Sequence, residues 1–190
     1  MTGEAYGVAA TIAAQGDAGA VVRVNRTPRA FLLNRGGTAV AQSSGVDEPG
    51  YVTTGRLTVN LRGSIDKAGA KALSTAEVEG LNILDGLITA ERVVAVSSSA
   101  GDGTMAASNV EGSGFFGLIV NGVPFGDVTP APNTTMEIPG GVVILNEHSP
   151  SGDGITAAAL TVNMVHVMLR GELIGDIVVL SSSSGVTVSP

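Results

Sequence analysis

Hydrophobic and polar residues alternate along much of the chain, with the two-residue period of a β-strand. The clearest case is residues 56–62 (RLTVNLR), where polar side chains separate Leu57, Val59 and Leu61. Because successive side chains of a strand point to opposite faces, this segment predicts a strand with one buried and one solvated face.

Several further segments read as strands, namely residues 87–98, 141–146, 156–170 and 176–180. The third of these (TAAALTVNMVHVMLR) is apolar on both faces near its centre. A strand of that kind is typical of the interior of a sheet that is covered on both sides.

Residues 65–79 (IDKAGAKALSTAEVE) fit two readings. Their Ala, Lys and Glu content permits a short helix, because these residues have high helix propensity. Alternation also fits, with small side chains at Ala70, Ala72, Ser74 and Ala76 on one face. We favour a strand from Ser74 onward and leave a short helix before it open.

The N-terminal segment differs in composition from the rest of the chain, because residues 5–14 (AYGVAATIAA) contain no charge and mostly small side chains. Read as a strand, it places Tyr6, Val8, Ala10 and Ile12 on one face. Such a strand can enter a groove in its own domain or in a neighbouring copy. We therefore predict an extended N-terminal arm over residues 1–35 and name these four residues as an assembly strand.

The whole pattern predicts an all-β protein, a two-sheet β-sandwich of Greek-key or jelly-roll kind with an extended N-terminal strand. The chain has 27 Gly and 8 Pro in its 190 residues, and they are scattered rather than gathered in one linker. Frequent turns between short extended segments produce that distribution. We place the sandwich domain at residues 36–190.

Charge excludes several classes of partner. Only 14% of residues are charged and the net charge is −7. Phosphate backbones and anionic lipid surfaces attract clustered Lys and Arg, so we predict neither nucleic-acid nor membrane-surface binding. No apolar stretch approaches the roughly 20 residues of a membrane span, so we predict no membrane insertion. The absence of Cys excludes disulfides and thiolate zinc sites.

Composition also bears on location. Ser, Thr, Asn and Gly supply the polar positions in place of charge, as is common in secreted β-proteins. The N-terminus has neither the basic segment nor the apolar core of a signal peptide. We predict the mature form of an extracellular or cell-surface protein.

Candidate chemistry is sparse. His166 shares its predicted face with Leu160, Val162 and Met164, which indicates a core histidine rather than a ligand. Residues 146–148 (NEH) offer metal donors, but no second cluster completes a four-ligand site.

Two Asp-in-glycine segments, around Asp102 and Asp153, read as turns in which Asp caps the backbone and Gly supplies positive φ. Calcium is the alternative reading of these loops, although no D-x-D-x-D-G run is present.

No hydrolase, metalloprotease or phosphate-loop motif occurs, so we predict no enzymatic activity and no cofactor. The serine runs at 97–99 and 181–184 read as solvated strand ends. Glu77 and Glu79 lie two apart on one strand face, where paired acids usually form a wet surface.

Several pieces occur together in order: residues 74–97 (STAEVEGLNILDGLITAERVVAVS), 117–124 (GLIVNGVP), 130–133 (PAPN) and 142–147 (VVILNE). With them, residues 70–185 resemble the choice-of-anchor P family of bacterial surface proteins. The resemblance implies a secreted, wall-associated β-domain paired with varying C-terminal anchors, and it brings no catalytic residues. This chain shows neither signal peptide nor anchor, which favours release or assembly.

We therefore expect a non-enzymatic extracellular structural protein, a self-assembling surface or filament subunit. Residues 5–14 would complete a sheet of a neighbouring copy and so build a homo-oligomer or homopolymer. The alternative is a monomeric adhesion or ligand-binding module. A third reading is a hydrolase with an unfamiliar site involving Asp102, Asp153 or His166.

Overall fold

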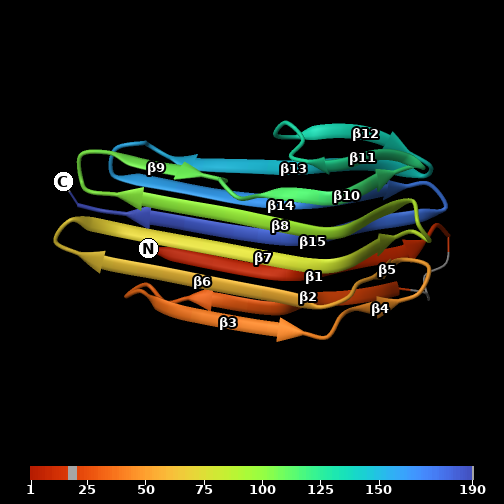
Figure 1. Ribbon diagram of the computed structural model, residues 1–190, viewed down its shortest axis with the longest axis horizontal. Coiled ribbons are helices and arrows are strands. Elements are labelled where there is room, and N and C mark those ends of the chain that lie inside the picture. Colours follow the sequence, from red (N-terminus) through yellow and green to blue (C-terminus); the bar gives the residue numbers. More distant parts are fainter. Residues whose placement is uncertain (17–20, 190) are drawn as a thin grey trace.

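The computed structural model describes residues 1–16 and 21–189, and every regular element among them is a β-strand (Figure 1). The six-stranded sheet has the order β12-β13-β14-β15-β1-β2. Its strands are β1 (Thr2–Ala14), β2 (Val21–Leu32), β12 (Thr134–Ile138), β13 (Gly141–Gly152), β14 (Ala157–Arg170) and β15 (Leu173–Thr187).

The nine-stranded sheet has the order β11-β10-β8-β7-β5-β4, with β6 between β7 and β3, and with β9 beside β8. Its strands are β3 (Gly37–Ser43), β4 (Asp47–Glu48), β5 (Val52–Thr53), β6 (Leu57–Asp66), β7 (Gly69–Ile83), β8 (Ile88–Gly101), β9 (Ala106–Asn109), β10 (Gly114–Val120) and β11 (Val123–Val128).

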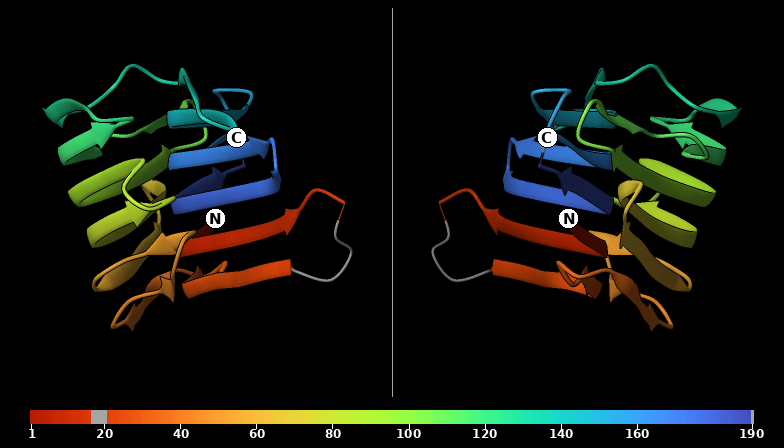
Figure 2. Two further views of the ribbon diagram at one scale, coloured as in Figure 1. Left: turned by 90° about the vertical axis from the view of Figure 1, so that its right-hand side faces the viewer. Right: turned by 90° about the vertical axis from the view of Figure 1, so that its left-hand side faces the viewer.

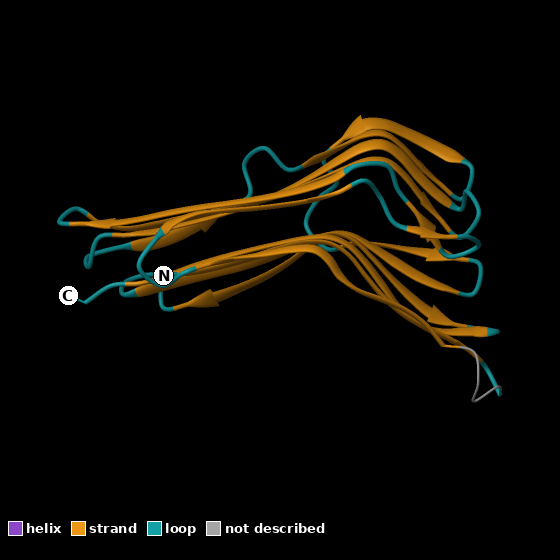
Figure 3. Ribbon diagram, turned by 90° about the horizontal axis from the view of Figure 1, so that it is seen from below, coloured by secondary structure: helices purple, strands orange, loops and turns teal. Residues whose placement is uncertain are grey.

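The two sheets pack face to face as two layers (Figures 2 and 3), so the predicted all-β, two-sheet sandwich is confirmed. Each sheet consists mainly of strands that follow one another along the chain. The chain crosses between sheets only after β2 and after β11. Short turns between successive long strands therefore dominate, and the order is closer to a meander than to a jelly roll, whose strands alternate between sheets.

The predicted N-terminal arm lies inside the sandwich. Strand β1 runs between β15 and β2, pairing Tyr6 with Ser181 on one side and with Arg29 on the other. Strand β2 pairs with no other strand in the part of the chain described, so β1 is what joins it to the sheet. Residues 17–20 lie outside the described residues.

Residues 65–79 form parts of two strands and no helix. Strand β6 ends at Asp66, a turn follows, and β7 begins at Gly69. Ala70, Ala72 and Ser74 alternate on its buried face, so the strand reading is confirmed and the helical alternative is wrong. Alternation with small buried side chains outweighs the helix propensity of Ala and Lys because burial against the second sheet decides the structure.

One half of the core consists of small residues, and there hydrogen bonds join the two sheets directly. Ser182 Oγ donates to the Ser74 carbonyl at 2.7 Å, and Ser74 Oγ donates to the carbonyl of Glu4 at 3.1 Å. Ser97 Oγ donates to the Leu160 carbonyl at 2.7 Å. The sheets approach closely enough for these bonds because Ala, Ser and Gly side chains are short.

The prediction of solvated serine ends is therefore wrong for the inward-facing serines. Ser97, Ser99, Ser182 and Ser184 are buried between the sheets. Each hydroxyl finds a partner, and this partner offsets the cost of burying a polar group.

Most of the large side chains lie in the other half of the core, although Leu61 lies beside Ser74. The largest fully buried ones are Phe115, Ile12, Leu57, Leu61, Ile83, Ile88, Leu118, Leu145, Met164, Ile177 and Leu180. Most of them come from β1, β7, β8, β10, β14 and β15, which form the centre of the sandwich.

A row of irregularities crosses the nine-stranded sheet. Glu79 pairs with Arg92 and Leu81 with Ala90, so Gly80 lies opposite Glu91 in an unchanged register, and β8 and β10 likewise stay in register across Gly117. In each of these strands two consecutive side chains face outward. Beyond that point the alternation of buried and exposed side chains continues, displaced by one residue. Gly80 and Gly117 have left-handed φ of 59° and 62°. We call each such place a bulge, because one residue interrupts the alternation of its strand while the register with the next strand is kept.

A second row crosses the six-stranded sheet, at Gly7, Leu180, Met164 and Asn146. Here two consecutive side chains face the core, as with Met164 and Val165. Figure 3 shows that both sheets bend in the same direction partway along. In both sheets the extra residue lies on the convex side, so the bulges account for the bend. The outer face of the six-stranded sheet becomes concave.

Candidate functional site

A cluster of titratable side chains lies on the concave face of the six-stranded sheet. His166 of β14 places Nδ1 3.1 Å from Glu147 Oε2 of β13 and Nε2 3.4 Å from Asp176 Oδ1 of β15. Asn163 Nδ2 donates to the same Glu147 oxygen at 2.7 Å. A neutral imidazole can donate to only one of the two carboxylates, whereas a protonated one can donate to both.

The prediction of a core histidine is wrong. His166 faces outward and is partly exposed, whereas Leu160, Val162 and Met164 are buried. The bulge at Met164 and Val165 shifts the alternation by one residue between these positions and His166. A single two-residue period drawn through residues 156–170 therefore assigns the wrong face to everything beyond the bulge.

Beside this cluster a hollow of about 350 Å³ lies over β1, β2 and β15. Tyr6, Arg26 and Asp176 line it, and small side chains such as Ala9 form part of its wall. Arg26 stacks over the Tyr6 ring at 4.9 Å, and its Nη1 lies 2.8 Å from Glu4 Oε1. This arrangement offers polar groups of both signs in a shallow concavity.

The four residues of the predicted assembly strand do not share one face. Val8, Ala10 and Ile12 point into the core of their own sandwich, whereas Tyr6 lies on the concave face under Arg26. The phase shift at Gly7 separates them. Whether β1 also serves a neighbouring copy stays a prediction.

Asn146 fixes the loop before β12. Its Nδ2 donates to the Pro130 carbonyl at 2.8 Å, and its Oδ1 accepts from His148 Nε2 at 2.8 Å. Burial lowers the pKa of His148. Among residues 1–16 and 21–189, no group of three or more His, Asp or Glu side chains is placed to hold a metal ion.

The end of the sandwich at which both termini lie, here called the terminal end, carries two rigid aspartate turns (Figure 1). Asp102 Oδ1 accepts from the Thr104 and Met105 amides and from Thr104 Oγ1, at 2.7 to 2.9 Å. Asp153 accepts from the backbone amides of residues 155–157 at 2.8 to 2.9 Å. The prediction of aspartate-capped turns is confirmed.

These hydrogen bonds favour the charged carboxylates. The Thr104 hydroxyl, followed by the backbone amides, lowers the pKa of Asp102 from 3.8 to about 2. The Thr156 hydroxyl and the neighbouring amides lower the pKa of Asp153 further still. Calcium binding by these loops stays a prediction.

Large apolar side chains are exposed at the terminal end: Leu33, Met105 and Ile155 in three turns, and Ile65 near the end of β6. Met105 and Ile155 are 64% and 57% exposed. Their two turns are joined, because the Ala106 amide donates to the Gly154 carbonyl at 3.0 Å. The pair is thus held in place at the surface by the aspartate turns beneath it.

The opposite end, here called the distal end, has an apolar cleft between the two sheets, of about 460 Å³. Its lining comes from the turns at 84–87, 139–140 and 171–172 and includes Leu84, Leu87, Leu169, Leu173 and Glu172. A smaller hollow of about 160 Å³ adjoins the same end, lined by Asp47 and Asp85. This end is therefore apolar at its centre and acidic around it.

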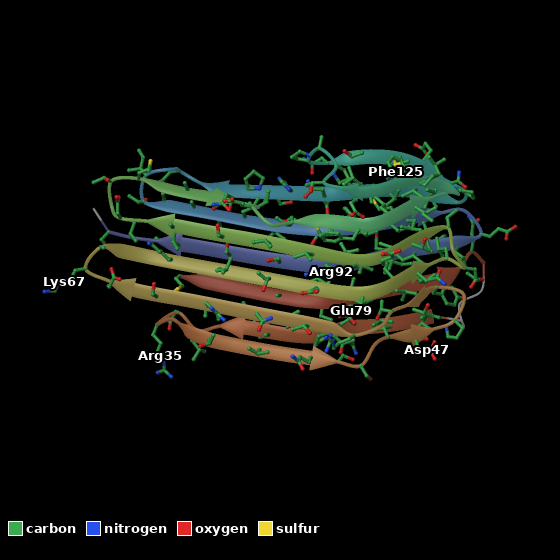
Figure 4. All side chains as sticks on the ribbon, viewed as in Figure 1. Arg35, Asp47, Lys67, Glu79, Arg92 and Phe125 are labelled. Atoms are coloured by element: carbon green, nitrogen blue, oxygen red, sulfur yellow. The ribbon has the colours of Figure 1, made fainter. Side chains whose placement is uncertain are left out.

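A shallow groove of about 640 Å³ crosses the outer face of the nine-stranded sheet near the terminal end. Arg62 and Lys71 lie on one side, Asn109 on the other, with Leu73 and small side chains between. Figure 4 places Lys67 and Arg35 at this same end and Asp47 at the opposite one.

Glu77 and Glu79 lie on the outer face of β7, as predicted for a solvated surface. Glu77 pairs with Arg92 at 2.6 Å and Glu79 with Arg56 at 2.8 Å, all with exposed side chains. Arg92 also lies over the Phe116 ring at 5.2 Å. Such exposed pairs contribute little to stability.

The structure adds residues that no sequence pattern singled out. At each end, side chains from turns far apart in the chain lie together. The one sequence signal for these residues is a large apolar side chain within a short Gly-containing turn, where polar residues are usual. The described residues contain no helix long and apolar enough to cross a membrane.

No family model, no curated protein and no solved structure matches the chain. The resemblance of residues 70–185 to the choice-of-anchor P family accordingly stays a prediction.

Proposed function

We propose that this protein is a non-enzymatic structural subunit that works outside the cell, on or near a cell surface, and assembles with copies of itself into a homopolymer. The observation that carries the proposal is the distribution of exposed apolar side chains. Leu33, Ile65, Met105 and Ile155 gather at one end of an elongated sandwich. Burying each would favour association by about 1.5–3 kcal/mol before the costs of binding.

The sheet edges support assembly through the ends rather than the sides. The long edge strand β2 carries Pro28 and the cations Arg23, Arg26 and Arg29, which hinder pairing with another chain. Pro150 lies in the part of β13 beyond the reach of β12, and Pro124 lies in β11. The edge strand β3 (GTAVAQS) and the short edge strand β9 (AASN) have neither charge nor proline, so strand addition between copies remains open there.

For β1 to add to the sheet of a neighbouring copy, the two copies would have to exchange their β1 strands. Both edges of β1 are paired along most of its length within its own chain, and these ladders would have to open first. Deleting residues 1–16 tests that route. Loss of assembly with a folded remainder would support exchange, and a truncated protein that unfolds assigns β1 to its own core.

Sedimentation velocity over a wide range of protein concentration tests the proposed function. Self-assembly predicts sedimentation coefficients that rise with concentration without reaching a plateau at the dimer. A single monomeric species up to high concentration would contradict it. Limited proteolysis of intact source cells tests the location, since a surface subunit is cleaved without lysis.

A second candidate function is ligand binding on the concave face, the monomeric adhesion reading. The hollow lined by Tyr6, Arg26 and Asp176, beside the His166 cluster, favours it. Planar hydrogen-bonding groups of that kind bind sugar hydroxyls. A glycan screen with wild type and Arg26→Ala tests it, with Arg23→Ala of the same strand, which does not line the hollow, as control. Equal signals from all three proteins would reject it.

A further inference from the structure

We propose that the assembly contact is head to tail. Met105 and Ile155 at the terminal end of one copy enter the cleft of Leu84, Leu87, Leu169 and Leu173 at the distal end of the next. This inference rests on the proposed function and names the partner as a second copy of this chain.

Shape and rigidity support the pairing. Met105 and Ile155 project from two turns whose backbones the Asp102 and Asp153 carboxylates fix, so little backbone conformational freedom is lost when they bind. A cleft of about 460 Å³ between two sheets accepts apolar side chains that a flat surface cannot bury.

Charge supports it independently. Six cations of the described residues make no ion pair, and four of them, Arg35, Arg62, Lys67 and Lys71, lie toward the terminal end. The three aspartates of that end, Asp66, Asp102 and Asp153, accept hydrogen bonds within their own turns.

Around the cleft of the distal end carboxylates outnumber cations: Asp47, Glu48, Asp85 and Glu172 lie there, together with Arg170. None of these four carboxylates makes an ion pair with another described residue. Opposite charges on opposite ends favour the head-to-tail encounter and disfavour contact between like ends.

The two surfaces differ and lie at opposite ends of the long axis, so the contact is heterologous. A heterologous contact without a closing rotation adds copies indefinitely and produces an open filament. The contact should weaken as ionic strength rises, because its rim charges are exposed to solvent.

Substitution of the apolar tips tests the contact. In Met105→Asp/Ile155→Asp, two carboxylates would face an apolar, acid-rimmed cleft, and we expect the association constant to fall by about tenfold or more. Val40→Asp is the matched control, since Val40 is 58% exposed but lies on β3, away from both ends. It should assemble like wild type. Assembly that is lost in Val40→Asp and kept in the tip variant would place the contact on the β3 edge.

Mixing tests the polarity. The tip variant keeps a working cleft, whereas Leu173→Asp keeps working tips and has a blocked cleft. Each alone should be monomeric, and an equimolar mixture should form dimers and nothing larger. If circular dichroism shows that Leu173→Asp is unfolded, Asp85→Lys/Glu172→Lys at the exposed rim replaces it.

The outcomes separate the two proposals. If wild type assembles and the tip variant assembles equally well, the head-to-tail contact is wrong and the structural role stands. If the wild-type protein never assembles, both the structural role and the head-to-tail contact are wrong. A mixture that stays monomeric while wild type assembles would also overturn the head-to-tail contact.

Discussion

At the scale of single residues, the buried serines define how close the sheets come. Ser184 Oγ lies 2.6 Å from Ser97 Oγ and 2.8 Å from Ser99 Oγ, and thus links the two sheets. A serine hydroxyl fits the short distance between the two sheets and can form a hydrogen bond across it. Serine is usually a surface residue, which is why its runs in the sequence indicate solvent rather than a core.

We expect Ser184→Ala to cost about 1 kcal/mol through its lost hydrogen bonds. Ser184→Val should cost more, about 1–3 kcal/mol on top, because its extra methyl groups would push the sheets apart. Thermal unfolding measures both, at roughly 2–4 °C per kcal/mol for a domain of this size. Ser183→Val, outward-facing on the same strand, is the control and should cost only its hydrogen bond from Thr161 Oγ1, about 1 kcal/mol or less. Equal stability of both valine variants would contradict this account of the core.

The aspartate turns should respond to acid. Because the pKa of Asp102 is lowered to about 2 from its ordinary 3.8, its charged form contributes stability above about pH 4. That contribution declines as pH falls through the window from about 4 to about 2. We expect the Met105 and Ile155 amide resonances to shift in NMR spectra within or below that window. Asp102→Asn should abolish the shift at Met105, and midpoints at or above pH 4 would contradict the turn geometry.

Asn146 is the residue on which the loop before β12 depends. Asn146→Ala would leave the partly buried Pro130 carbonyl and the His148 ring nitrogen without their hydrogen-bond partner, and would place Ala at a φ of 53°. We expect a loss of about 1–3 kcal/mol of unfolding free energy. Chemical denaturation measures it, and an unchanged denaturation midpoint would contradict the role assigned to this side chain.

At the scale of elements, the bulge rows decide which side chains face the core. Period-two alternation predicts each strand half well, as with Leu57, Val59 and Leu61, all fully buried. It fails where a bulge lies within one apolar run, as at His166 and Tyr6. The sequence contains no signal for Leu180 as a left-handed residue. The interruption of the alternation is recognised only when neighbouring strands are seen side by side, because it recurs in register from strand to strand.

Single-residue deletions in β7 test the bulges. Removal of Gly80 takes out the extra residue and keeps Val78 and Leu81 on the inner face. Removal of Ala76 instead turns the rest of the strand over, which exposes buried residues such as Val78, at about 1.5–3 kcal/mol for each large side chain. We expect the first variant to fold with reduced stability and the second not to fold, as measured by circular dichroism and yield. A folded Ala76 deletion would contradict the assigned register.

At the scale of the whole molecule, sequence pattern is sufficient for the fold class and insufficient for the surfaces. Alternation together with scattered Gly and Pro predicts a two-sheet sandwich, and the structure has one. The ends could not be predicted, because each is assembled from several turns that are remote in the chain. Met105 and Ile155 meet only through the fold, as do Leu87 and Leu173.

Placing residues 1–35 as a separate arm was wrong for a related reason. The small residues and lack of charge of residues 5–14 permit a strand that enters a neighbouring copy, but they suit equally a central strand beside β15 of the same chain. The small side chains of β1 match the close approach of the sheets where Ser74 reaches the Glu4 carbonyl.

The most direct test of head-to-tail assembly uses the absence of native cysteine. In Met105→Cys/Leu87→Cys, one thiol lies at each end, so oxidation of assembled protein should produce a ladder of covalent multimers on a denaturing gel. Val40→Cys/Leu87→Cys, with a thiol of similar exposure on β3, should remain largely monomeric. A ladder in the first variant alone is the predicted result. The same pattern in both variants, or no multimer beyond a dimer in the first, would contradict it.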